Sequence, residues 1–503
     1  MTSYISEKQL TIEGFETPFH NKLNPNNRWV KLKSIVPWDV FATKYLSLMN
    51  TKIGRPSICP RIVLGALIIK HLENLSDEGV VLAIQENIYM QYFVGLSSFT
   101  TAAVFAPSLL VEIRKRIGHE TFDELNVALI KSLSHEKDKN HNAKNRKDDG
   151  EPKNKGKMQA DATVADQYIT YPTDSETLNQ SRKKLEGIID NLYIKDEKQG
   201  VKCRTYRRSL SKAFLNYSKK RRKKKGDHRK MNRKLLEAVR RNIGYIDAYL
   251  DKFESKNAPF PLSKKEQHML LVIRTVYDQQ KTMYDNKTHS HPDRIVNIFQ
   301  PHVRAIPRGK TKSKTEFGSK LGVSLDNGFA RINTFSWNAY HEAGDLIKQI
   351  ESYKELHGHY PELVQVDQIY PTRANRKWLK EKGIRITAKP LGRPKETNEL
   401  SYYKKQKLKK EARERNHIEG KFGQGKNAYN LNKIRAKLRK TSESWVACIF
   451  FVMNLLNHQK KYPSFSLSYL FCAILNRLTQ VNSTISTIKS IFFRNHHLSI
   501  IKC

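Results

Sequence analysis

Three acidic side chains, far apart in the sequence, are candidates to hold a metal ion together. Asp161 lies inside an alternating stretch, Asp367 ends a short apolar run, and Glu419 stands among glycines and basic residues. Carboxylate oxygens are the hard ligands that magnesium prefers. A pair of such ions can activate an attacking oxygen and stabilise a leaving oxygen during phosphoryl transfer. The three acids therefore predict metal-dependent chemistry at a phosphate group, if the fold brings them together.

Each acid also has a plain structural interpretation. Asp161 could be a turn or strand-edge residue bonded to the backbone, and Asp367 could cap the helix expected to begin near Thr372. Glu419 could pair with Arg415, four residues earlier. Such an exposed pair contributes only about 0.3–0.5 kcal/mol, and an arginine before a glutamate is the weaker order. The residues alone leave both interpretations open.

Two basic residues accompany Glu419 at helical spacing. At about 100° per residue, Arg415, Glu419 and Lys426 project within roughly 40° of one another. Arginine can bind a phosphate through two parallel hydrogen bonds. One helix face would then carry a metal ligand between two phosphate-binding cations. This geometry requires the helix to continue through three intervening glycines, which is its weakest point.

The elements that must position these side chains follow from hydrophobic periodicity. Alternating or short apolar stretches predict strands, and a repeat of about 3.6 residues predicts helices. In chain order the sequence predicts a strand at 158–164, a hairpin closed by Asn327-Gly328, a helix at 339–356, a strand at 363–367, a helix at 373–383, a strand at 384–389 and a long basic helix from about residue 400. This order predicts an α/β, ribonuclease H-like domain with a mixed five-stranded sheet and helices.

The same patterns predict how the chain is divided. Helical periodicity, as in "RIVLGALIIKHLENLS", predicts a helical N-terminal domain over residues 1–134, and the strongly polar stretch 135–157 predicts a linker. The ribonuclease H-like domain is expected over 158–457, interrupted by a basic helical insertion at 181–290. Residues 458–503 form a C-terminal extension to which the sequence assigns no role.

Composition points to a polyanionic partner. The chain has 503 residues and a formal net charge of +42, which favours nucleic acid. No signal-peptide pattern and no apolar run long enough for a membrane span are found, so a cytoplasmic protein without membrane contact is expected. Five scattered cysteines without paired spacing predict neither a disulfide framework nor a zinc site.

Several segments together resemble the DDE transposases of bacterial insertion sequences, specifically the insertion sequence five family. The resemblance runs from about residue 50 to 457. It rests on "GRPSICPRIVLGALIIKHLENLSDEGVVLAIQENIYMQYFVGL", "QADATVADQYITYPTD", "VDQIYPTRANRKWLKEKGI", "LGRPK" and "RNHIEGKFGQGK". The first of these segments is similar to the family's helical N-terminal domain, so the resemblance implies that residues 1–134 bind DNA. The last segment fits the signature Arg-x3-Glu-x6-Lys. Two positions depart from the family pattern, because Ala412 stands where the signature has tyrosine and Ile369 where many relatives have glycine. The departures leave the three acids intact, but they weaken any transfer of DNA-end contacts.

The resemblance implies an enzyme that cleaves DNA at the inverted-repeat ends of an insertion sequence and transfers the strands to a target. Asp161, Asp367 and Glu419 would be its catalytic residues and would hold Mg²⁺, with Mn²⁺ as a substitute. The partner is double-stranded DNA, and two ends must be paired, so a homodimer is expected in the active complex. The protein would then associate with the nucleoid when bound to DNA.

The resemblance also implies which basic residues contact DNA. Arg415 and Lys426 would clamp phosphate near the scissile bond, and Arg373 and Arg376, on the helix after the second aspartate, would reach DNA. Trp378 could stack on an unpaired base, although a tryptophan on an amphipathic helix more often belongs to the core.

Weaker motifs remain. Gly54-Arg55-Pro56 and Gly392-Arg393-Pro394 resemble minor-groove hooks, but such tripeptides also occur in ordinary loops. The run Lys219–Lys225 is either a solvated helix face or a phosphate-binding surface. His289 and His291 lack further ligands nearby and are assigned no site.

Two other functions stay open. A catalytically inactive DNA-binding protein derived from a transposase would keep the charge and the fold. An RNA-binding protein would explain the charge but not the three acids.

Overall fold

The computed structural model describes residues 22–49, 57–141, 154–307, 315–388 and 402–461. Both tripeptides with a Gly-Arg-Pro sequence, most of the predicted linker and most of the C-terminal extension lie outside these residues. The chain divides into two compact units, a helical unit (Met1–Asp148 and Ala447–Cys503) and a sheet unit (Asp149–Val446). Across the described part of the chain, no helix has the length and apolar character needed to cross a membrane.

The regular elements described in the helical unit are all helices. The third of them, α3, is buried over almost its whole surface, as its apolar sequence requires, and α4 starts at Ser76, whose side chain accepts a hydrogen bond from the Gly79 amide. The helices are α1 (Arg28–Lys33), α2 (Trp38–Ser47), α3 (Pro60–Leu72), α4 (Asp77–Glu86), α5 (Ile88–Val94), α6 (Leu109–Arg116) and α7 (His119–His141), with α16 (Arg439–Lys461) beginning in the sheet unit and ending here.

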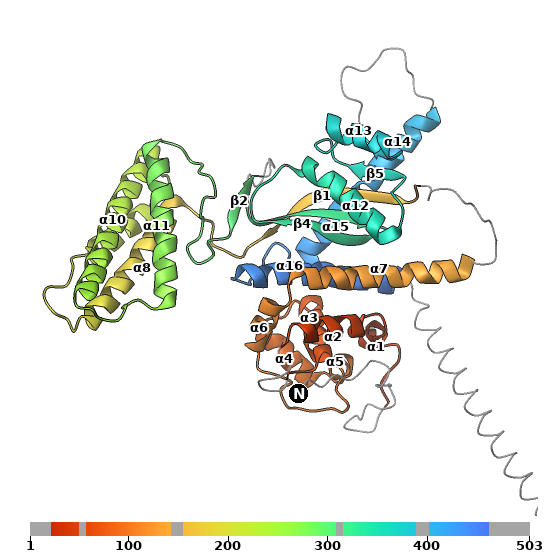
Figure 1. The fold of residues 1–503 in the computed structure, drawn as a ribbon, viewed down its shortest axis with the longest axis horizontal. Helices are drawn as coiled ribbons and strands as arrows, with labels where there is room; N and C mark the ends of the chain where they lie inside the picture. Colours follow the sequence, from red (N-terminus) through yellow and green to blue (C-terminus); the bar gives the residue numbers. More distant parts are fainter. Residues whose placement is uncertain (1–21, 50–56, 142–153, 308–314, 389–401, 462–503) are drawn as a thin grey trace, which may run out of the picture. The chain divides into compact units, whose positions relative to one another are not determined.

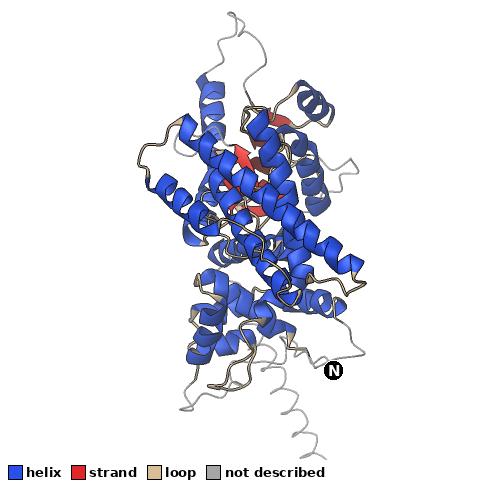
Figure 2. Ribbon diagram, turned by 90° about the vertical axis from the view of Figure 1, so that its left-hand side faces the viewer, coloured by secondary structure: helices blue, strands red, loops and turns tan. Residues whose placement is uncertain are grey.

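The sheet unit is built on one mixed sheet (Figure 1). Its strands are β1 (Lys157–Asp166), β2 (Arg304–Pro307), β3 (Thr315–Asp326), β4 (Phe329–Ser336), β5 (Leu363–Val366) and β6 (Arg385–Thr387). β3 pairs antiparallel with β1, β2 and β4, whereas β5 runs parallel to β1 and to β6. In Figure 2 the strands gather in this sheet, and the rest of the described chain is helix and loop. Three antiparallel strands followed by helix-connected parallel ones is the order expected from the sequence.

The number of strands differs from the prediction, because the sheet has six strands and not five. The missed strand is β2, which has four residues and ends in Pro307. It pairs only with the first residues of β3. A strand this short shows no alternation, and proline is tolerated only where no ladder hydrogen bond is needed from its nitrogen. The prediction failed here because periodicity needs a longer segment.

The connections agree with the sequence in outline. Asn327 and Gly328 both have positive φ, 48° and 78°, and close the β3–β4 hairpin as expected. The helix expected at 339–356 is a 3₁₀ turn, η2 (Glu342–Asp345), followed by α12 (Leu346–His357). α13 (Arg373–Glu381) follows β5. The single basic helix expected from residue 400 is two helices, α14 (Tyr402–Glu414) and α15 (Asn416–Ala428), which meet at Arg415.

The insertion between β1 and β2 is helical, and it begins before the predicted residue 181. It consists of α8 (Asp174–Lys195), α9 (Arg207–Lys219), α10 (Lys225–Ser255) and α11 (Lys264–Asp285). Apolar residues of α8, α10 and α11 form its core, and a capping box of Ser263 and Glu266 starts α11. The run Lys219–Lys225 is not a helix face, because it connects the end of α9 to the start of α10.

A buried pair of glutamines binds α14 to the sheet. Gln159 of β1 and Gln365 of β5 are register partners. The Nε2 of Gln159 donates to Gln365 Oε1 at 3.0 Å and to the main-chain oxygen of Glu414 at 2.6 Å. The Nε2 of Gln365 donates to the main-chain oxygen of Glu411 at 2.8 Å. These bonds hold the last turn of α14, and therefore the start of α15, against one face of the sheet.

We expect Gln159→Ala to loosen this junction. The substitution leaves the Glu414 carbonyl and the Gln365 side-chain oxygen without their donor, which costs about 1–3 kcal/mol when the acceptors are buried. Hydrogen–deuterium exchange of the α14 and α15 amides should become faster, and unfolding in urea should occur at lower concentration. Gln199→Ala, which removes an exposed glutamine, is the control. Unchanged exchange in α14 and α15 would show that other contacts hold the junction.

Candidate active site

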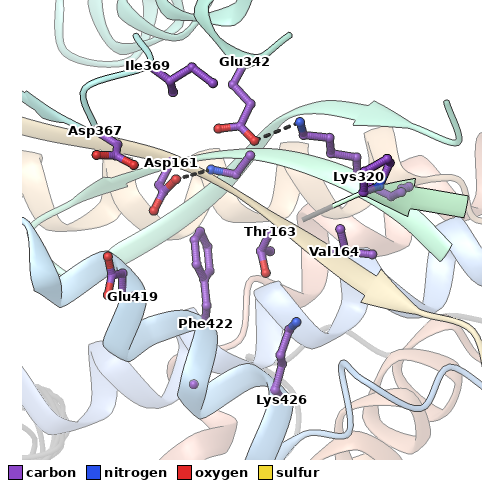
Figure 3. Close-up of a pocket in the computed structure, with 14 residues that line it drawn as sticks. Asp161, Thr163, Val164, Lys320, Glu342, Asp367, Ile369, Glu419, Phe422 and Lys426 are labelled. Carbon is purple, nitrogen blue, oxygen red and sulfur yellow. Dashed lines mark hydrogen bonds and ion pairs between the residues drawn. The ribbon is translucent and has the colours of Figure 1, made fainter. Parts of the chain in front are cut away.

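The three candidate acids face one cavity of about 690 Å³ in the sheet unit (Figure 3). Its walls come from β1, β2, β3, η2, the loop after β5 and α15. Asp161, Asp367 and Glu419 all line it. The fold therefore brings together side chains that are 206 and 52 residues apart in the sequence.

Register explains why the two aspartates are neighbours. The last paired residues of β1 and β5 are Ala160 and Val366, and Asp161 and Asp367 are the next residue on each strand. Each aspartate also lies two residues after one of the paired glutamines, and side chains two apart on a strand share a face. The face that α14 and α15 cover is therefore the face that carries the acids.

The surroundings of Asp161 disfavour its negative charge. Its side chain is 17% exposed, and Oδ1 accepts a hydrogen bond from the Ala162 amide at 2.7 Å. Burial raises the pKa of Asp161 to about 6, and the negative charges of Glu342 and Asp367 add to this rise, while the Ala162 amide and Arg415 oppose it. Asp161 pairs with Val323 of β3, and β5 pairs with β1 only up to Ala160. Asp161 is therefore a strand residue and not a turn residue, and the bond to the backbone considered from the sequence exists.

Asp367 lies directly after β5 and is exposed. Its Oδ1 accepts a hydrogen bond from the Gln368 amide at 2.7 Å. The helix-capping interpretation is wrong, because Thr372 is the N-cap of α13 and accepts from the Asn375 amide. Asp367 is therefore available to the cavity.

Glu419 lies in the first turn of α15 with its side chain 54% exposed. Its Oε1 accepts from Arg415 Nη2 at 2.9 Å, so the ion pair considered from the sequence exists. Arg415 Nη1 is also 4.0 Å from Asp161 Oδ2. The guanidinium of Arg415 thus lies between two acids that the sequence placed in a metal site.

Helix α15 continues through its glycines, as the proposed geometry requires. A Cβ atom added at Gly420 or Gly423 would meet no other atom within 4 Å. Gly423 also lines the cavity. Gly420 and Gly423 are therefore not required by packing within the described chain, although each costs about 0.5–1 kcal/mol relative to alanine in a helix.

The cavity offers the ligand atoms that a divalent metal needs, but the side chains are not positioned to bind one as they stand. In the residues that the structure describes, no three His, Cys, Asp or Glu side chains are close enough to hold a metal ion as they stand. The oxygens that face the cavity are nonetheless carboxylates from three elements, the kind that Mg²⁺ and Mn²⁺ prefer. Asp161 is buried near two further acids, so a cation beside it would be stabilised. The exposed side chain of Glu419 is free to change its rotamer toward such an ion.

The candidate DNA-binding residues divide into two groups. Lys426 lines the cavity and bonds Glu316 Oε1 at 3.1 Å, and Arg415 touches the acids. Arg373 is exposed at the start of α13, and Arg376 donates from Nε to the Pro371 carbonyl at 3.0 Å. Neither of these two residues lines the cavity. The structure therefore brings only two of the four cations to the acids.

Trp378 is partly buried: it packs against the apolar cluster beneath α12 and α13 and contacts the Tyr360 ring edge-on, which favours the core interpretation.

Sequence reasoning missed two charged residues of the cavity wall. Glu342 of η2 and Lys320 of β3 both line it, and Lys320 Nζ bonds Glu342 Oε1 at 2.8 Å. Figure 3 shows Glu342 extending toward the two aspartates. "HEAGD" before α12 carries no motif, so only the fold reveals this fourth acid. Thr163 could have been found, because it lies two residues after Asp161 on the same face of β1.

We expect Asp161→Asn to stabilise the metal-free protein above about pH 7. The pKa of Asp161 is near 6 in the folded state and about 3.9 in an unfolded chain. A raised pKa contributes stability that is complete below the unfolded value and is lost as pH rises through the folded value, a loss of about 2–3 kcal/mol. Asparagine does not titrate and escapes this loss. Urea unfolding with a chelator should therefore show an advantage for the variant that grows from about pH 4 to pH 7.

Asp251→Asn, at an exposed position of α10, is the matched control and should show no such trend. If Asp161→Asn is no more stable at high pH than the parent, the pKa of Asp161 is not raised in the folded state.

Replacing the fourth acid should lower the pKa of Asp161. Glu342→Gln removes a negative charge that favours the protonated carboxyl of Asp161 and frees the positive charge of Lys320, and both effects act in the same direction. The pH at which the parent loses stability should therefore move down, measured by the same unfolding series. Glu355→Gln, exposed on α12, is the control. An unmoved profile would mean that Glu342 does not couple to Asp161.

Two segments of the chain match protein-family models. Residues 364–456 match a transposase DDE domain, a segment that contains Asp367 and Glu419 but not Asp161. Residues 17–116 match a transposase domain (DUF772).

The chain is 31% identical over 153 residues to the uncharacterized protein ORF8 in the nfe locus of Rhizobium meliloti, a match that covers 30% of this chain and 68% of that protein. No solved structure matches the chain. Both family matches are to transposase domains, which supports a DDE transposase.

Proposed function

We propose that this transposase binds the inverted-repeat ends of an insertion sequence, of the insertion sequence five type, and catalyses metal-dependent DNA cleavage and strand transfer. The observation that carries the proposal is the cavity that Asp161, Asp367, Glu419 and Lys426 line, with Arg415 beside two of the acids. The strand order of the sheet supports a ribonuclease H-like catalytic domain around it. The protein would act in the cytoplasm, on the DNA of the nucleoid.

The reaction needs two in-line attacks at phosphorus. A water oxygen attacks a phosphodiester at the transposon end, the bond from phosphorus to the departing oxygen breaks, and a 3′-hydroxyl is released. That hydroxyl then attacks a phosphodiester of the target, so one phosphodiester forms as another breaks. Each step exchanges one P–O bond for another, so no nucleotide cofactor is consumed.

The side chains of the cavity have separate tasks in this proposal. Asp161, Asp367 and Glu419 would hold Mg²⁺, or Mn²⁺ in its place, and the bound ion would activate the attacking oxygen and stabilise the leaving one. Arg415 touches two of the acids and is placed to bind a phosphate oxygen next to them. Lys426, further along the same wall, would bind a second phosphate. The cations thus hold the DNA strand along α15 while the acids serve the scissile bond.

A homodimer is proposed for the active complex, because one copy must act at each of two paired ends.

An inactive DNA-binding protein derived from a transposase is the second candidate. It is favoured by the Arg415–Glu419 ion pair and by the absence, within the described residues, of a ready metal cluster. The retention of all three acids favours the enzyme. RNA binding leaves the acids unexplained.

The test is cleavage of DNA that carries the reading frame with its natural flanks. With Mg²⁺ or Mn²⁺ the protein should nick the DNA at inverted repeats, and chelation should stop the reaction. Asp161→Ala should lower the rate more than about a thousandfold, because an essential group of the reaction is removed, and should leave DNA binding intact. Asp251→Ala is the matched control.

Equal cleavage by Asp161→Ala would remove Asp161 from the site. Binding without cleavage by the parent protein, in both metals, would establish the inactive alternative.

A further inference from the structure

The net positive charge of the helical insertion comes from one segment. Residues 204–241, which we call the basic segment, contain seventeen Lys and Arg but only two acids. The rest of the insertion, residues 174–203 and 242–285, has twelve of each. The basic segment comprises α9, the turn after it and the first half of α10. The insertion is therefore electrically neutral except on this one part of its surface.

The charges of the basic segment are exposed and are mostly not neutralised by acids. Among the described residues, only Arg207, Lys220 and Arg233 of the segment have a carboxylate oxygen within 4.0 Å. Elsewhere in the insertion half of the twelve cations pair with a carboxylate, for example Lys252 and Lys256, which share Asp196. Unpaired like charges repel one another and destabilise a fold. Their retention on this surface favours a polyanionic ligand.

Aromatic rings orient several of these cations without cancelling their charge. A cation held over a ring keeps its full charge for a further partner. Four such contacts are present: Arg229 over Tyr284 at 4.1 Å, Lys223 over Tyr217 at 5.5 Å, and Arg241 and Arg204 over Tyr206 at 5.0 and 5.7 Å. The basic segment is thus a positioned array and not a loose tail.

Hydrogen bonds fix where on the helical bundle this array lies. Ser175, at the start of α8, lies 3.2 Å from the Tyr217 hydroxyl near the end of α9. Arg229, near the start of α10, donates to the carbonyl of Tyr284 near the end of α11 at 3.1 Å. The turn after α9 is therefore at the end of the bundle through which the chain enters from β1 and leaves toward β2. The turn after α9 and the start of α10 thus belong to the end of the insertion that is tied to the sheet carrying the acids, whereas Arg204 and Arg241 lie further along the bundle.

We propose that the basic segment binds the phosphate backbone of double-stranded DNA, independently of sequence, as a second DNA contact of the molecule besides the cavity. Duplex DNA carries one negative charge per roughly 1.7 Å of its axis, and each phosphate that a cation neutralises releases a counterion. A rigid array of lysine and arginine with few competing acids matches this ligand. DNA is favoured over other polyanions because two segments of the chain match transposase domains. The proposal does not depend on cleavage by the cavity.

The experiment compares two triple variants of the full chain. Lys219→Ala, Arg221→Ala and Arg222→Ala remove from the basic segment three exposed cations that pair with no acid of the described chain. Lys183→Ala, Lys264→Ala and Lys265→Ala remove three exposed cations from the neutral part of the insertion. Binding of a labelled duplex of arbitrary sequence is measured by fluorescence anisotropy at several salt concentrations, with a chelator present. Circular dichroism confirms that both variants are folded.

We expect only the first variant to weaken binding, by about tenfold or more at low salt. The slope of log affinity against log salt should become shallower by about 0.9 for each phosphate that the variant no longer neutralises. Equal weakening in both variants would mean that net charge alone acts, and unchanged binding by the first would remove the segment from DNA binding; either result overturns the proposal. A preferential effect on binding to duplex RNA or to phosphatidylserine vesicles would also overturn it. Asp161→Ala, with its cavity disabled, should keep the parent's slope, which separates this proposal from the cleavage chemistry.

Discussion

The proposed catalytic geometry depends on hydrogen bonds made by two buried amides. Gln159 and Gln365 face each other across β1 and β5 and are bonded to the last turn of α14. A buried amide without its partner is costly, so the helix cannot slide along the strands without breaking several bonds. The helix after this turn carries Arg415 and Glu419, and the strands carry the two aspartates two residues further on. These uncharged contacts therefore set the distance between Glu419 on the helix and the two aspartates of the strands, which would otherwise repel one another.

The negative charges of the cavity create a second constraint, which lowers the stability of the fold. Asp161 is buried close to other negative groups, and its raised pKa shows that the fold does not stabilise its charge. A site that is ready to receive a cation is necessarily under-neutralised without one, and stability is commonly lower where function requires such an arrangement. Arg415 lies between Asp161 and Glu419 and offsets part of this imbalance. The same residue is proposed to bind phosphate, so its position serves the protein both with and without DNA.

Much of this arrangement was accessible from the sequence, and the remainder was not for identifiable reasons. The strands around Asp161 and before Asp367 are long or apolar enough to show their pattern, and the hairpin is encoded by Asn327 and Gly328. The short strand β2 and the break at Arg415 are decided by tertiary contacts that no local pattern contains. Glu342 enters the cavity because η2 turns it there, and nothing in its neighbours marks it. Helix phase alone also could not show that Arg373 and Arg376 lie away from the cavity lining.

At Gly420 and Gly423 helix α15 presents main chain without side chains. With no side chain at Gly423, the cavity wall there is main chain, and nothing in the described structure fills the space that a methyl group would take. A sugar–phosphate strand could therefore approach this helix more closely than it could approach a helix lined with ordinary residues. Alanine at this position would favour the helix by about 0.5–1 kcal/mol while making the passage narrower. At this position a wider passage for the strand and a more stable helix therefore exclude each other.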